Sequence, residues 1–186
     1  MSMSKHDAVI RLDASNCAFE ALTPHYGAMC CEAASFCFEQ HRHFVPTRAA
    51  LNGCDTPHAH FHWTSPPAQA AATYRDRDVA AEQGAYAVAI AVLNQFHGYK
   101  VIERSVKGTG FDFWIGTTAD SLPFQNKVRL EVSGIFEGQS RVNARLKSKL
   151  KQMAPSDQSG CGFAVVAEFG SPTIAVGKRK SSNGDE

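Results

Sequence analysis

The sequence predicts a mixed α/β (α+β) fold, and two observations support that prediction. Residues 78–176 alternate one long apolar helix, three strands, a second helix and two strands. The composition is that of an ordinary globular protein, because 44% of the 186 residues are hydrophobic and 20% are charged. A chain of this length can bury one sizeable core and, at most, a small second lobe.

The N-terminal part, residues 1–70, is expected to form an α/β extension or a small lobe. AVIRL, residues 8–12, predicts a short strand, and apolar residues recur at helical spacing over about residues 26–41. In TSPPAQAAATY, residues 64–74, a Pro-Pro pair precedes a run of small residues. Such a stretch favours a soft boundary between two differently built halves.

The expected core, residues 71–177, begins with a long helix. DVAAEQGAYAVAIAVLNQFHG has Asp78 near its start and Gly98 as a stop signal, and it is apolar nearly all round, which predicts burial. The segments YKVIER, FDFWIG and KVRLEVSGI predict three strands, the first two joined by the turn-forming SVKGTG. An antiparallel meander is the simplest arrangement of these strands.

A basic amphipathic helix is predicted over SRVNARLKSKLKQM, residues 140–153. Two apolar strands, CGFAVVAEF and TIAV, follow it and are separated by Gly170, Ser171 and Pro172. Residues 178–186 are rich in polar and charged side chains and are expected to form a disordered tail.

Two carboxylates stand on the predicted strands. Alternation along the third strand puts Glu131 on a polar face. An amphipathic strand whose polar face meets water would explain this placement without any functional role. That face comprises Lys127, Arg129, Glu131 and Ser133, opposite Val128, Leu130 and Val132. On the preceding strand Asp112 is expected to point away from Phe111 and Phe113, although aspartate suits a strand interior poorly. In a meander Asp112 and Glu131 would meet, offering the hard oxygen ligands that Mg²⁺ prefers.

A third carboxylate, Glu82, lies in the first turns of the long helix. It continues the apolar stripe that contains Tyr86, so we expect it to face the sheet rather than solvent. Favourable placement of an acidic residue near a helix N-terminus explains Glu82 equally well.

The order of helix, three-strand meander, helix and strand, with these three carboxylates in place, resembles the PD-(D/E)xK nuclease superfamily, which has the restriction-endonuclease-like fold. The resemblance covers about residues 76–177. It implies that Asp112 and Glu131 bind Mg²⁺ or Mn²⁺, that Glu82 is an auxiliary carboxylate, and that the chain hydrolyses phosphodiester bonds of nucleic acid, with DNA as the expected substrate.

The motif differs from the superfamily pattern at two positions. Phe111 stands in place of proline, and Ser133 stands in place of the lysine two residues after Glu131. A serine hydroxyl can hold a water but supplies no positive charge. A substitute cation is expected from Lys127, the first choice, from Arg129, or from a lysine of the basic helix. Without one, the chain would be a catalytically inactive module that binds DNA or a protein, for example an accessory factor of a bacterial defence or mobile-element system.

The basic helix is the candidate nucleic-acid contact. It carries five cations and no acidic residue, although the protein as a whole has a formal net charge of only +1. Arg141, Arg145 and Lys149 are the expected phosphate contacts, while a merely solvated face would account for the same pattern. The sequence leaves open a homodimer or a protein partner.

Other chemistry is less well supported. His58, His60 and His62 in HAHFHW could chelate a transition metal, but a half-exposed strand with its histidines outward explains their alternation. None of the six cysteines falls in a CxxC pair, so free thiols are expected. The N-terminus has no apolar signal run and no window is apolar enough for a membrane span, which predicts a cytoplasmic protein without a membrane partner.

Overall fold

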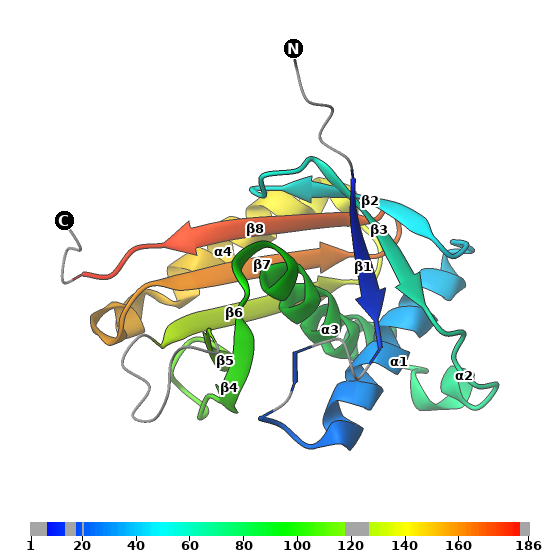
Figure 1. Ribbon diagram of the computed structural model, residues 1–186, viewed down its shortest axis with the longest axis horizontal. Helices are drawn as coiled ribbons and strands as arrows, with labels where there is room; N and C mark the ends of the chain where they lie inside the picture. The colour runs from blue at the N-terminus through cyan, green and yellow to red at the C-terminus, as the bar shows by residue number, and fades with distance from the viewer. Residues whose placement is uncertain (1–6, 14–17, 20, 118–126, 183–186) are drawn as a thin grey trace, which may run out of the picture.

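The computed structural model describes residues 7–13, 18–19, 21–117 and 127–182. Within them, eight strands form one mixed sheet in the order β1-β3-β2-β8-β7-β6-β5-β4. Helices pack on both faces of this sheet (Figure 1). The predicted α/β class is therefore confirmed.

The second half of the chain supplies five of the strands. The meander is antiparallel from β4 to β6, and α4 then carries the chain to β7, which runs parallel to β6. β8 returns antiparallel to β7. The bounds are α3 (Arg77–His97), β4 (Lys100–Arg104), β5 (Phe113–Gly116), β6 (Val128–Ile135), η1 (Gln139–Arg141), α4 (Val142–Gln152), η2 (Ala154–Ser159), β7 (Gly162–Glu168) and β8 (Thr173–Arg179).

The local signals at the ends of α3 are clear. The Asp76 side chain accepts hydrogen bonds from the backbone N–H groups of Asp78 and Val79, so the helix begins one residue before the predicted start. Gly98 takes a left-handed conformation with φ 68° and ends the helix where the sequence predicted.

The N-terminal part adds three strands to the same sheet. β2 pairs in parallel with β8, β3 pairs antiparallel with β2, and β1 pairs in parallel with β3 at the sheet edge. The bounds are β1 (Ala8–Leu12), α1 (Pro24–Gln40), β2 (Thr47–Asn52), β3 (His58–Trp63) and α2 (Ala70–Thr73). The sequence predicts β1, α1 and β3, but not β2 or α2.

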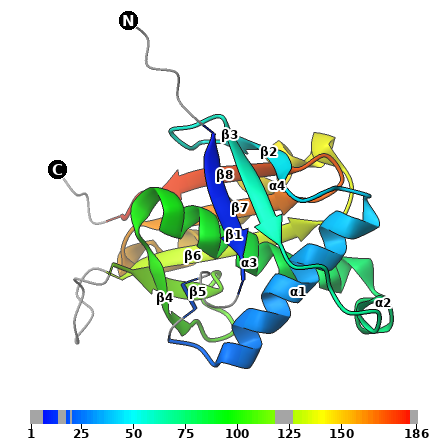
Figure 2. The same ribbon diagram turned by 45° about the vertical axis from the view of Figure 1, so that its right-hand side comes forward.

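The sheet separates two helical layers. α1 and α3 pack together on one face, where the largest apolar cluster lies, and α4 covers β6, β7 and β8 on the other. Figure 1 shows α3 in front of the sheet and α4 behind it, and Figure 2 shows α1 beside α3. Polar residues of β6 therefore face α4 rather than open solvent.

Two expectations are wrong. The predicted tail begins too early, because β8 continues to Arg179, which binds Asp157 and donates to the Leu150 carbonyl at 2.9 Å. Residues 183–186 lie outside the described part of the chain. Phe111 does not share a face with Phe113: it packs against Met153 on the α4 side, since β5 begins only at Phe113 and the chain turns at Asp112.

No helix among the described residues combines the length and the apolar character that crossing a membrane requires.

Candidate functional site

The site lies where β5 separates from β6. The Asp112 N–H still donates to the Leu130 carbonyl at 2.9 Å, but β5 pairs with β6 no further along β6 than Leu130. The Asp112 carboxylate then accepts the backbone N–H of Val132 at 2.8 Å, replacing the ladder bond that β5 no longer supplies. An aspartate at this position therefore satisfies the strand end and remains beside the next residues of β6.

Asp112 and Glu131 are brought together by this geometry. Their carboxyl groups are close enough to interact electrostatically, and Glu131 is only 2% exposed. Burial, followed by the nearby Asp112 charge, raises the pKa of Glu131 to about 7. Burial likewise raises the pKa of Asp112, against the pull of the Val132 N–H. The two carboxyls therefore hold a proton more tightly than isolated acids do.

Glu82 reaches the pair through Tyr86. The Tyr86 hydroxyl lies 3.3 Å from Glu82 Oε1 and 3.4 Å from Asp112 Oδ1. Burial raises the pKa of this hydroxyl, so it remains a donor over the physiological range. Glu82 itself is exposed, so the expectation that it faces the sheet instead of solvent is wrong. One helical turn separates it from Tyr86, which is the residue buried against the sheet.

A glycine on β6 allows α3 to approach the site so closely. A Cβ atom at Gly134 would lie 2.0 Å from the Ala81 carbonyl oxygen. Any larger residue would push α3 away and carry Glu82 with it.

The cation that reaches Glu131 comes from α4. Lys149 Nζ lies 2.5 Å from Glu131 Oε1, and Gln152 Nε2 donates to the same oxygen at 3.0 Å. Arg145, one turn before Lys149, donates to the Ser133 hydroxyl at 3.3 Å. The crossover from β6 to β7 places this face of α4 over the polar face of β6.

The other two candidate cations lie elsewhere. Lys127 pairs with Glu103 at 2.8 Å and lies over the Trp114 ring, away from Glu131. Arg129 is fully buried and donates to the Met153 carbonyl at 2.9 Å and to Asp157 at 3.1 Å. It fixes the end of α4 to the sheet. Of the predicted sources, the basic helix is the one that delivers a cation to the carboxylates.

A cavity of about 300 Å³ opens beside these groups, between α3 and α4. Its acidic wall comes from α3 and its basic wall from α4 and the turn before it. The lining residues are Asp78, Glu82, Val132, Ser133, Gly134, Arg141, Arg145 and Lys149. Arg141 and Arg145 are exposed at its mouth, where they could meet a phosphate-bearing ligand.

The donor set suits a hard cation that retains waters. Two neighbouring carboxyl groups supply oxygen ligands, and ligands of this kind suit Mg²⁺ or Mn²⁺. Within the described residues, no group of three or more His, Cys, Asp or Glu side chains is arranged around a common metal position. A cation here would therefore depend on water and substrate oxygens for its remaining ligands.

The histidines of β3 do not form a metal centre in the described part of the chain. His58, His60 and His62 lie on the open face of the strand, as alternation predicted, and Nε2 of His60 is 3.3 Å from Asp7. Ala59, Phe61 and Trp63 form the buried face.

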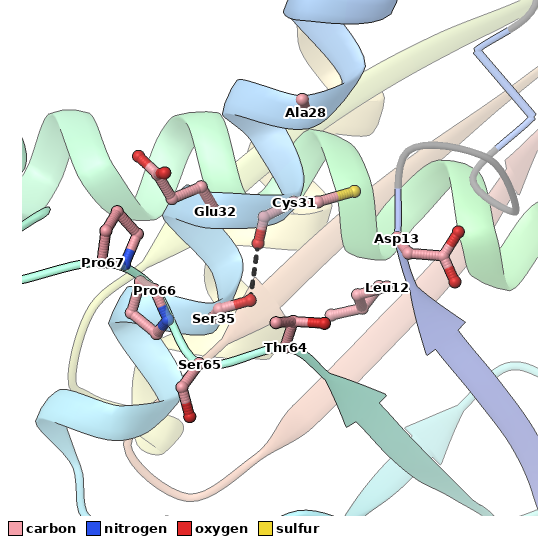
Figure 3. Close-up of a pocket in the computed structure, with 10 residues that line it drawn as sticks. All are labelled: Leu12, Asp13, Ala28, Cys31, Glu32, Ser35, Thr64, Ser65, Pro66 and Pro67. Atoms are coloured by element: carbon pink, nitrogen blue, oxygen red, sulfur yellow. Dashed lines mark hydrogen bonds between the residues drawn. The ribbon is translucent and has the colours of Figure 1, made fainter.

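A separate pocket of about 280 Å³ lies between α1 and the segment after β3 (Figure 3). Ser35 on its wall donates to the Cys31 carbonyl within its own helix. Asp13 and Glu32 are its charged lining residues, and among the residues that the structure describes no basic side chain lines it. This pocket is therefore unsuited to a nucleic-acid phosphate.

The structure also adds Tyr86 and Gln152 to the site. In the sequence, Tyr86 belongs to the packing stripe of the long helix and Gln152 lies near the end of the basic helix, so neither pattern predicts a role in the site. The four-residue spacing of Glu82 and Tyr86 is a signal that could have linked the two. Comparison with protein-family models, with curated proteins and with solved structures found no match to this chain.

Proposed function

We propose that the chain is a metal-dependent nuclease with a restriction-endonuclease-like core, acting on nucleic acid and by expectation on DNA. The observation that carries the proposal is the neighbouring pair of carboxyl groups of Asp112 and Glu131, with the Lys149 ammonium on Glu131. The order of α3, the antiparallel meander, α4 and the parallel β7 agrees with the resemblance drawn from the sequence.

Asp112 and Glu131 would hold Mg²⁺ or Mn²⁺. The bound ion would lower the pKa of a coordinated water and neutralise charge on the scissile phosphate. Asp112 is fixed for this role by the Val132 N–H and lies within reach of the Tyr86 hydroxyl, so its carboxylate needs little rearrangement.

Lys149 would supply the positive charge that Ser133 lacks. Its ammonium lies against Glu131, where it can donate to an attacking water or to a phosphate oxygen. Ser133, held by Arg145, offers a hydroxyl that can position the same water. Arg141 and Arg145 at the cavity mouth would bind the phosphate backbone.

The experiment is cleavage of mixed DNA and RNA substrates by the purified protein with Mg²⁺ or Mn²⁺. Asp112→Asn and Glu131→Gln should each abolish cleavage. Glu103→Gln is the matched control, because it removes a carboxylate whose partner, Lys127, lies outside the site. Cleavage that survives both site variants would contradict the proposal.

A non-catalytic nucleic-acid-binding or protein-binding module on the same core is the second candidate. One observation favours it: the Lys149 ammonium already compensates the charge of Glu131, so the site is satisfied without a metal. Nucleic-acid binding that persists with no cleavage under any metal would select this candidate.

A further inference from the structure

Arg104, at the end of β4, is an exposed cation that is nevertheless held in place. Its Nη1 donates to the Tyr26 hydroxyl at 2.8 Å. Its guanidinium also lies over three aromatic rings, at 5.4 Å from the centroid of Tyr26 and 5.7 Å from those of Tyr86 and Phe113. Contacts from α1, α3 and β5 therefore restrict a side chain that would otherwise sample many rotamers.

The Arg104 guanidinium has N–H donors that make no hydrogen bond to the described residues. Among the described residues, no carboxylate lies within ion-pair distance of Arg104, and its one hydrogen-bond partner there is the Tyr26 hydroxyl. A planar guanidinium presents five N–H donors in a fork that matches two oxygens of a phosphate. Aromatic rings beneath it leave its outer edge available for such a ligand.

Arg104 stands next to the candidate site. The Tyr86 ring below it belongs to the same side chain whose hydroxyl lies 3.4 Å from Asp112 Oδ1. The turn after Arg104 leads directly to Asp112, because the Ser105 N–H donates to the Asp112 carbonyl at 2.8 Å. One aromatic side chain therefore separates the guanidinium from the carboxylate pair.

Arg104 and the basic helix lie on opposite sides of the carboxylates. Arg104 is paired with Phe113 in the β4–β5 ladder, and Phe113 faces the α3 layer. Arg145 and Lys149 reach the site from α4, on the other face of the sheet. A backbone that passes over Asp112 and Glu131 would thus meet cations before and after the reacting phosphate.

We propose that Arg104 binds a backbone phosphate of the nucleic-acid strand that flanks the scissile bond, on the α3 side of the site. This inference rests on the proposed function and adds a second phosphate contact that the basic helix does not provide. The substrate strand then runs from α4, across the carboxylates, to the edge strand β4.

The test measures binding of fluorescently labelled single-stranded and duplex DNA, without metal, as salt rises from about 50 to about 200 mM. Arg104→Gln should weaken binding and lower the log–log salt slope by about 0.9 on duplex or about 0.7 on a single strand. Arg104→Lys should keep the salt slope, because it keeps the positive charge, but should bind less tightly, because an ammonium lacks the paired N–H donors of the guanidinium. Arg48→Gln is the control, since Arg48 is an exposed arginine on β2 that pairs with Asp7.

A second variant guards against loss of folding in Arg104→Gln. Tyr26→Phe keeps the charge but removes the hydroxyl that holds the guanidinium, so it should lower affinity at an unchanged slope. Wild-type binding with an unchanged slope in Arg104→Gln would overturn the inference and leave the proposed function standing. Failure of the wild-type protein to bind either DNA would overturn the inference for DNA together with the expectation that DNA is the substrate.

Discussion

Replacing Lys149 by methionine should destabilise the metal-free protein, and by an amount that depends on pH. The Lys149 side chain is 20% exposed and that of Glu131 is 3% exposed, with 2.5 Å between Nζ and Oε1. Exposed ion pairs contribute about 0–1 kcal/mol, whereas breaking a buried pair costs about 3–5 kcal/mol. A pair of intermediate burial should cost about 2–3 kcal/mol when both partners are charged.

The sign of the pH dependence follows from the pKa of Glu131. Burial raises this pKa from 4.5 to about 7, so the folded state keeps the proton that the unfolded state releases. Stability from this group is therefore greatest below pH 4.5 and falls as pH rises through about 7. Lys149 opposes the shift, so its removal matters little where Glu131 is protonated and most above pH 7.

The assay is urea unfolding of the wild-type and Lys149→Met proteins at pH 5 and pH 8, in the presence of a chelator. Lys147→Met is the matched control, because Lys147 is exposed on the same helix two residues away. The reasoning is refuted if Lys149→Met lowers the free energy of unfolding equally at both pH values, or by no more than Lys147→Met does at pH 8.

Three further predictions concern the same site. Lys149→Met should abolish metal-dependent cleavage, and adding Ser133→Lys should restore part of it; a double variant as inactive as the single one would argue against a shared role. Affinity for Mg²⁺ should rise with pH through about 7, because the carboxylate pair must release its proton, and calorimetry in two buffers of different ionisation enthalpy should detect that proton. Gly134→Ala should lower the free energy of unfolding by about 1–3 kcal/mol in urea titrations, since its Cβ would meet the Ala81 carbonyl; an unchanged midpoint would mean that α3 moves freely.

The sequence predicts the second half of the fold well because its elements have strong local signals. α3 is apolar enough to be buried, and β6 and β7 are rich in β-branched residues. β2 was missed for the opposite reason. Its sequence, TRAALN, has neither alternation of large apolar residues nor β-branched runs, and it is a strand because β3 and β8 pair with it on both sides.

The candidate site was only partly predictable, because strand alternation fixes a face but not what covers it. Alternation placed Glu131 and Ser133 together on the face that α4 covers. It also made Lys127 the first choice of cation, but Lys127 binds Glu103 on β4 instead. The choice of Lys149 depends on how far along β6 the α4 crossover passes, and no local signal in the sequence encodes that register.

The small residue at position 133 is consistent with a cation that arrives from the helix. Ser133 is 5% exposed and already lies 3.3 Å from Arg145. A lysine there would bring a second ammonium beside Lys149 and Arg145 in a nearly buried space, where like charges disfavour one another. In the wild-type background Ser133→Lys therefore has to displace one of these cations. Ser133 on β6 and Lys149 on α4 therefore form one arrangement, in which the small strand residue leaves room for the charge that the helix supplies.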